Sequence, residues 1–325
     1  MIKNSDVTGL GALNIDKIYK VERVLCDGEA VAEEMGCFPG GSAANTIYGL
    51  AMLGVDVGFI GAVGDDDKGK LIIEDLKAAG VNISQITVKH RIESGSTLCF
   101  SDSSGERSIY VTPGANSLLC DNDLSVGFIN ESILLHLSSF VNDEQFRLSL
   151  ELVSKLAPSV KLSFSPGELY VSRGIGVLAP ILGRTDILFI NRKEVEKLTG
   201  KDFRSGAEAC RKQGCRTVVV TLGNGEDTVC GTASPASCYI ASDDGECMVG
   251  SADYAGVNAV DTTGAGDAFA AGFIYGLLKN KGLEECGHLG DITARLCVCE
   301  FGARQGLPTP TRLSRRYYEL YNEPL

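Results

Sequence analysis

Late in the chain, a carboxylate directly follows three small residues, a pattern suited to phosphoryl transfer. The small residues are Gly264, Ala265 and Gly266, the carboxylate is Asp267, and the helical pattern Ala268–Leu278 comes next. Small residues at a helix start let a ligand approach the backbone, whose unpaired N–H groups bind anions. The helix dipole favours a carboxylate in the first turn, so we expect Asp267 to be ionised and to accept a proton. A tight turn with an N-cap aspartate would leave the same pattern without a catalytic role.

A second glycine-containing segment precedes a helix early in the chain. Gly40 and Gly41 stand before the helical pattern Ala43–Leu53, and Asn45 lies in its first turn. The glycine pair lets the backbone reach a ligand, and the Asn45 amide offers a polyol both a donor and an acceptor. A glycine pair before a helix is common by itself. Together with the Asp267 segment, it predicts a kinase that aims the hydroxyl of a small acceptor at a phosphoryl group.

Short apolar runs alternate with helical patterns along most of the chain. The expected strands are Val7–Leu13, Val57–Ala62, Ile133–Leu137, Lys161–Ser165, Ile187–Ile190, Thr217–Thr221 and Asp227–Cys230. The expected helices, besides the two above, are Lys68–Ala79, Asp143–Leu156, Lys193–Thr199, Gly206–Gln213, Leu283–Glu300 and Leu313–Tyr321. Strands that alternate with helices predict an α/β fold with a mainly parallel sheet covered on both faces.

Two segments, Lys17–Cys37 and Ser94–Thr112, break this alternation and look like strand hairpins. We expect them to form a small β layer beside the main sheet, from about residues 15–38 and 94–112. The sequence shows no internal repeat and no low-complexity linker. Residues 1–325 are therefore predicted to form a single domain with this β appendage.

The composition argues against several classes of protein. Hydrophobic residues make up 44% of the chain, an ordinary proportion for a globular protein. The formal net charge of −12 repels nucleic acid and anionic lipid, so neither is an expected partner. The N-terminal sequence lacks the apolar core of an export signal, and glycines and Asp56 interrupt the apolar window Ile47–Val63. We expect a cytoplasmic protein without a membrane span, whose 12 cysteines are buried, reduced thiols.

The two glycine segments, in this order, resemble those of the ribokinase-like (PfkB) carbohydrate and nucleoside kinases. The resemblance runs from about residue 7 to about residue 310. It implies a ribokinase-like three-layer sandwich, ATP as the phosphoryl donor, and a β lid that covers the acceptor and also forms a homodimer contact. Asp267 is then the general base, and the backbone of Gly264–Asp267 is the anion hole. The resemblance assigns the acceptor to Asn14, Asp16, Gly40, Gly41 and Asn45.

The resemblance also implies positions for the nucleotide. Asn191 and Glu194 match the family's N-x-x-E motif, which acts mainly through water on Mg²⁺. A helix-capping box has the same spacing, and both roles can hold together. Thr221 and Gly223 match the T-L-G-x-x-G nucleotide loop, although its second glycine, Gly225, comes one place early. Adenine would then lie between this loop and the helix near residues 294–297.

A monovalent cation such as K⁺ binds beside the anion hole in relatives. The backbone carbonyls of Asp261 and Thr263 match two of its ligands. In ribokinase a serine hydroxyl also contributes, at the position where this chain has Gly306. K⁺ dependence therefore stays open. The acidic run Asp65–Asp67 is interpreted as a solvated turn rather than a metal site.

The acceptor is the least determined part of the resemblance. Ribokinases carry a lysine after the glycine pair, where this chain has Ser42. Our first choice is phosphorylation of the hydroxymethyl group of a ribose- or fructose-like sugar. A nucleoside such as adenosine comes second, and a 2-keto-3-deoxy sugar acid or a catalytically silent sensor is less favoured. Apolar or aromatic side chains on the inner face of the lid, from Phe38, Phe100 or Tyr110, would favour a nucleoside.

Overall fold

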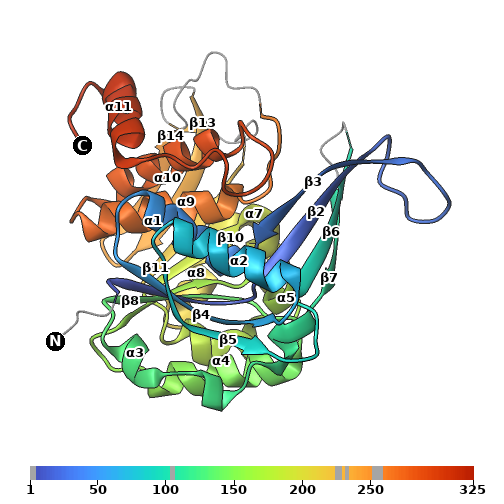
Figure 1. Cartoon of the computed structure of the whole chain (residues 1–325). Helices are drawn as coiled ribbons and strands as arrows, with labels where there is room; N and C mark the ends of the chain where they lie inside the picture. Colours follow the sequence, from blue (N-terminus) through green and yellow to red (C-terminus); the bar gives the residue numbers. More distant parts are fainter. Residues whose placement is uncertain (1–4, 103–106, 224–228, 231–233, 251–258) are drawn as a thin grey trace.

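The chain is built around one large, mainly parallel sheet. The computed structural model describes residues 5–102, 107–223, 229–230, 234–250 and 259–325. In this part the strand order is β12-β13-β11-β10-β9-β8-β1-β4-β5, with β14 paired to β13 (Figure 1). Its strands are β1 Val7–Leu10, β4 Val57–Gly64, β5 Asn82–Lys89, β8 Leu134–Ser138, β9 Lys161–Ser165, β10 Ile187–Asn191, β11 Thr217–Thr221, β12 Val229–Cys230, β13 Ser234–Ser242 and β14 Gly245–Gly250. Strands β12–β14 add antiparallel pairs at one edge.

Helices cover both faces of this sheet and create a separate core on each. In β10, Leu188 and Ile190 pack into one core, and Ile187 and Phe189 into the other, because successive strand side chains point to opposite faces. The first core is closed by α3 Val126–Asn130, α4 Asp143–Lys155, α5 Gly167–Val171, α6 Ile175–Leu182, α7 Arg192–Thr199 and α8 Phe203–Lys212. The second is closed by α1 Ser42–Met52, α2 Asp67–Ala78, α9 Ala265–Leu278, α10 Leu283–Cys297 and α11 Pro310–Tyr321. The predicted three-layer α/β architecture is confirmed.

Four further strands form a second, smaller sheet that projects from the body (Figure 1). They are β2 Asn14–Val21, β3 Ala32–Gly40, β6 Gly95–Ser101 and β7 Arg107–Thr112, in the order β3-β2-β6-β7. Strand β2 runs parallel to β6, and the two outer pairs are antiparallel. The expected β layer therefore exists, built from the two segments that broke the strand–helix alternation. We call this sheet the lid.

The predicted elements differ from the observed ones mainly at their ends, whereas β5, β13, β14, α3, α5 and α6 were not predicted. The expected strand Val7–Leu13 is two strands, because β1 ends at Leu10 and Asn14 already begins the lid strand β2. Helix α8 begins at Phe203, three residues before its prediction, since the Asp202 side chain caps it. Helix α10 ends at Cys297 rather than at Glu300. Of the expected strand 227–230, only 229–230 lie within the described residues.

The cysteines and the apolar window were largely interpreted correctly. The eleven cysteines with described side chains are free thiols. Cys26, Cys37 and Cys120 are exposed, which corrects the expectation that all are buried. Within the described part of the chain, every helix is too short or too polar to span a membrane.

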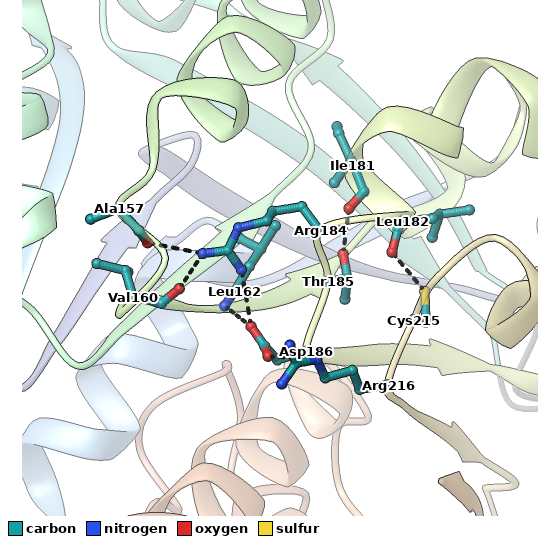
Figure 2. Close-up of polar contacts among 10 residues, drawn as sticks. All are labelled: Ala157, Val160, Leu162, Ile181, Leu182, Arg184, Thr185, Asp186, Cys215 and Arg216. Carbon is teal, nitrogen blue, oxygen red and sulfur yellow. Dashed lines mark hydrogen bonds and ion pairs between the residues drawn. The ribbon is translucent and has the colours of Figure 1, made fainter. Parts of the chain in front are cut away.

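A polar cluster links the amino ends of the three neighbouring strands β9, β10 and β11 of the main sheet (Figure 2). The Asp186 carboxylate accepts a hydrogen bond from the Leu162 N–H at 2.8 Å, at the start of β9. Arg184 Nη1 lies 3.3 Å from the same carboxylate, and Arg184 Nη2 donates to the carbonyls of Ala157 and Val160 at 3.0 and 2.6 Å. Arg216, just before β11, completes the cluster with a 3.6 Å contact to Asp186.

Removing this carboxylate should lower stability without changing catalysis. We expect Asp186→Ala to reduce the free energy of unfolding by about 1–3 kcal/mol, because the buried Leu162 N–H and the partly buried Arg184 guanidinium lose their acceptor. The turnover number should be unchanged, because the cluster lies at the amino ends of the strands. The predicted site residues Asn191 and Thr221 lie at the carboxyl ends of β10 and β11. Urea unfolding and steady-state kinetics measure the two effects. Glu208→Ala, which removes an exposed carboxylate from α8, is the control and should change stability by less than about 0.5 kcal/mol. Equal stabilities of the two variants would contradict the assigned role.

Candidate active site

A cleft of about 300 Å³ lies where the carboxyl ends of β9, β10 and β11 meet the start of α9. Ligands of open α/β sheets bind at this edge, where loops follow parallel strands. Its lining residues come from six parts of the sequence and are Ser42, Arg107, Ser165, Gly167, Phe189, Ile190, Asn191, Glu194, Thr221, Thr262 and Gly264–Asp267. The predicted base, the predicted anion hole and the predicted Asn191–Glu194 motif are therefore brought to one cleft.

Two side chains of α1 hold the carboxylate of Asp267. The Ser42 hydroxyl donates to Oδ1 at 2.7 Å, and the Asn45 Nδ2 donates to Oδ2 at 2.9 Å. Burial raises the pKa of Asp267 to about 6, although both hydrogen bonds lower it. This pKa is higher than the helix dipole alone would suggest, yet the carboxylate is mainly ionised at neutral pH. A base with a pKa just below the working pH suits proton abstraction from an alcohol.

The start of α9 presents backbone donors beside this carboxylate. Gly264 is the N-cap and has a φ of 76°, in the left-handed region that favours glycine. A Cβ at Gly264 would collide with Ala303, so the turn also needs the missing side chain. The Ala265 N–H donates to the Thr262 carbonyl at 3.3 Å. Among the described residues, no acceptor pairs with the N–H groups of Gly266 and Asp267, which are left to bind an anion.

A buried arginine orients the asparagine that contacts Asp267. Arg304 Nε donates to the Asn45 Oδ1 at 3.0 Å, which turns the Nδ2 of that amide toward Asp267. The Arg304 guanidinium also pairs with Asp75 of α2 at 2.5 Å and donates to the Gly40 carbonyl. Arg304 is 4% exposed, so its charge needs these partners. A chain of contacts thus runs from Asp75 through Arg304 and Asn45 to Asp267.

Sequence reasoning missed Ser42 and Arg304. Ser42 directly follows the glycine pair and begins α1, a position that could have marked it as a ligand. Arg304 stands alone in a segment of small and apolar residues, which is an unusual place for a charge. Neither side chain was assigned a role from the sequence.

Asn14 and Asp16 lie at the base of the lid and are buried. The Asn14 Oδ1 accepts a hydrogen bond from Asn116 at 3.0 Å, and the Asp16 Oδ1 accepts one from the Thr97 hydroxyl at 2.6 Å. A Cβ at Gly40 would collide with the Asp16 carboxylate, which explains a glycine at that position. Neither Asn14 nor Asp16 lines the 300 Å³ cleft, but Asp16 is close enough for its charge to raise the pKa of Asp267.

The predicted nucleotide residues are only partly brought together. Asn191 and Glu194 form a reciprocal capping box, with distances of 2.9 and 3.0 Å, at the start of α7. Both line the cleft, as does Thr221 at the end of β11. Gly223 has a φ of 65° but does not line the cleft. Gly225 lies outside the described residues.

The carboxylates near Glu194 suit a divalent cation that arrives with a nucleotide. Burial raises the pKa of Glu194, and the nearby charges of Glu168 and Asp267 raise it further. The capping box uses one carboxylate oxygen of Glu194 and leaves the other for water or a metal. A Mg²⁺ ion would relieve the repulsion among these groups, and its preference for retained water fits an indirect contact. In the described parts of the chain, no three His, Cys, Asp or Glu side chains cluster as a direct metal site.

Asp261 ties two loops together beside the anion hole. Its Oδ1 accepts hydrogen bonds from the Thr263 N–H and hydroxyl at 2.9 and 2.7 Å, and its Oδ2 accepts one from the Gly302 N–H at 2.9 Å. In the acidic run Asp65–Asp67, which was interpreted as a solvated turn, the half-buried Asp66 carboxylate caps α2 by accepting a hydrogen bond from the Gly69 N–H.

Comparison with known proteins agrees with this geometry. Residues 4–310 match the family model described as pfkB family carbohydrate kinase, so the chain belongs to that family. It is therefore an ATP-dependent phosphotransferase that acts on a sugar or a nucleoside. A sugar kinase of Archaeoglobus fulgidus is 37% identical over 80% of this chain and 98% of its own length. An ATP-dependent ribose-1-phosphate kinase of Halopiger xanaduensis is 30% identical over 92% and 93%. The crystal structure of a Thermotoga maritima ribokinase is similar with a TM-score of 0.79 and 25% identity, covering 96% of this chain and 98% of the other.

The hydrogen bonds to Asp267 predict a pH effect. Activity should fall as the pH drops through about 6, because protonated Asp267 is no longer a base. Asn45→Ala and Ser42→Ala each remove a donor that lowers this pKa, so the acid limb of kcat/KM should move to higher pH. Thr46→Val is the matched control, since Thr46 donates only to the Asp267 backbone carbonyl. An acid limb that stays in place in both alanine variants would contradict the assignment.

Proposed function

We propose that this protein transfers the γ-phosphoryl group of MgATP to the hydroxymethyl group of a furanose sugar. The observation that carries the proposal is the shared position of the Asp267 carboxylate and the free N–H groups of Gly266 and Asp267 in one cleft. A base and an anion hole so close together serve an alcohol acceptor and the phosphoryl group that it attacks. The relatedness to sugar kinases and a ribokinase structure supports the same acceptor class.

In this mechanism, Asp267 accepts the proton of the acceptor hydroxyl while the hydroxyl oxygen attacks the γ-phosphorus of ATP. Asn45 and Ser42 fix the carboxylate so that one geometry is presented to the alcohol. The backbone N–H groups at the start of α9 stabilise the charge on the transferring oxygens. Mg²⁺ carried by the nucleotide would neutralise phosphate charge near Glu194. Water is the competing acceptor, and a lid over the cleft excludes it.

The remaining assignments follow the same proposal. Asn14 and Asp16 would bind the ring hydroxyls of the sugar. Gly40, Gly41 and Asn45 would line the same side of the acceptor site. The ATP would lie along Asn191, Thr221 and the loop at Gly223, with adenine toward α10. K⁺ would bind at the carbonyls of Asp261 and Thr263, where the Asp261 carboxylate already fixes the neighbouring loop.

A nucleoside is the second candidate, and one observation favours it. On the inner face of the lid, Ile18, Cys99 and Ile109 stand next to one another and give an apolar surface. Phe38 also lies on this side, where its ring approaches Gly302 of the body. The other two expected aromatic residues lie on the opposite face of the lid and do not support a nucleoside: Phe100 stacks on Tyr19 with ring centroids 5.2 Å apart, and Tyr110 packs edge-on against Phe100.

The decisive variant is Asp267→Asn, which keeps the backbone donor and removes the base. We expect kcat to fall by about 10²–10⁴-fold, while the ATP dissociation constant changes by less than about threefold. Acceptor-dependent ADP release with ribose, fructose, adenosine and cytidine measures the first quantity, and calorimetric titration the second. An unchanged kcat would remove Asp267 from the base role. A native protein that releases no ADP with any of these acceptors or their phosphorylated forms would contradict the proposed function.

A homodimer through the lid belongs to the same proposal. Leu98 and Tyr110 lie opposite each other on the face of the lid turned away from Asp16, and they are 39% and 59% exposed. A second copy of the chain packed against these two side chains would bury their apolar surface, which favours a dimer. Light scattering after size exclusion should give twice the monomer mass, and Leu98→Lys should give the monomer. A native monomer at micromolar concentration would contradict this contact.

A further inference from the structure

A second cleft, of about 360 Å³, adjoins the active cleft under the outer part of the lid. From the lid it is lined by residues that include Ile18, Lys20 and Arg107, and from the body by the loop Asp261–Thr263. Arg107 and Thr262 line both clefts. A substituent on the side of the acceptor away from Asp267 would therefore extend into the second cleft.

The inner face of the lid changes its chemistry with distance from the body. Residues that are directly opposite on neighbouring strands share one face of a sheet. Outward from the body, this face carries three rows, which are Asp16, Thr97 and Val111, then Ile18, Cys99 and Ile109, then Lys20, Ser101 and Arg107. The first row holds a carboxylate suited to sugar hydroxyls, the second is mainly apolar, and the third carries two cations.

The two cations of the third row have no anionic partner in the described part of the chain. Lys20 and Arg107 lie on the strands that flank Ser101, so their backbones are about 10 Å apart. Two carboxylates also line the second cleft, but both are engaged. Asp102 accepts a hydrogen bond from the Val24 N–H at 3.1 Å, and Asp261 ties Thr263 to Gly302. Lys20 and Arg107 are therefore the charged groups of this cleft that are left to bind an anion.

We propose that Lys20 and Arg107 bind an anionic group of the acceptor. The substrate class is then a furanose or related sugar that carries a phosphate ester or a carboxylate at the end remote from its free hydroxymethyl group. This inference rests on the proposed function, because it takes Asp267 as the point where that hydroxymethyl group is phosphorylated. It makes the third row of the lid the determinant of acceptor choice.

The two cations have separable tasks. Arg107 lines both clefts and lies close enough to Asp267 and Glu194 for its charge to lower their pKa values, so it also faces the transferring phosphoryl group. Lys20 lines only the second cleft. Loss of Arg107 should therefore affect both kcat and the acceptor KM, whereas loss of Lys20 should act mainly on the KM of an anionic acceptor.

The test compares acceptors that differ in one group. Ribose, ribose 1-phosphate, 2-keto-3-deoxygluconate and adenosine would be assayed with the native protein and with Lys20→Gln and Arg107→Gln. We expect the native kcat/KM for one of the anionic acceptors to exceed that for ribose and adenosine by about tenfold or more, and Lys20→Gln to reduce this preference by about tenfold. Lys17→Gln is the matched control, because Lys17 lies on the same strand but on the opposite face, and it should keep the preference.

Each outcome decides between the two proposals. Equal or better turnover of ribose or adenosine would overturn the anion site and leave the kinase assignment standing. A preference for an anionic acceptor that survives both Lys20→Gln and Arg107→Gln would also overturn it. If no acceptor is turned over, the proposed function fails, and thermal shift by ribose 1-phosphate tests the site alone. A shift that is present in the native protein and Lys17→Gln but lost in Lys20→Gln supports the anion site, and no shift in the native protein overturns it.

Discussion

The contact between the Asp267 carboxylate and the start of α1 is the interaction on which the rest of the site depends. Its two donors, Ser42 and Asn45, belong to one helix, so Asp267 can hold its position only if α1 and α9 keep a fixed relative position. Small residues make that relation possible. A Cβ at Gly49 of α1 would lie 2.8 Å from the Ala271 Cβ of α9, so the helices approach at the limit that their side chains allow. Packing of the second core thus sets the geometry of the groups that we propose as catalytic.

Two opposing effects act on the pKa of Asp267. Burial favours the protonated form of Asp267, and the hydrogen bonds from α1 favour the ionised form. Because burial wins, the native state binds more protons than the unfolded state between the ordinary pKa of 3.8 and about 6. Stability contributed by this group therefore decreases as the pH rises through that range. This loss of stability arises at Asp267, the residue that we propose as the proton acceptor.

The sequence predicted those features that depend on neighbours along the chain. Strands β9 and β11 end where their apolar runs end, and both glycine segments lie before helices because turn and helix-start chemistry is local. Strand β5 was missed because it is an edge strand whose side chains are half-buried or exposed, and it lacks a continuous apolar run. The partnership of Arg304 with Asn45 and Asp75 was missed because nothing local in the sequence records a contact between distant segments.

The contact between Arg304 and Asp75 joins residues 229 positions apart, and Ser42 is 225 positions from Asp267. During synthesis on the ribosome, the N-terminal half emerges long before these partners exist. Contacts of such large sequence separation form late, since the intervening chain must first be ordered. A nascent or truncated chain that lacks the segment around Arg304 lacks the donor that holds the Asn45 Oδ1, so the full set of contacts around Asp267 forms only after that segment has been made.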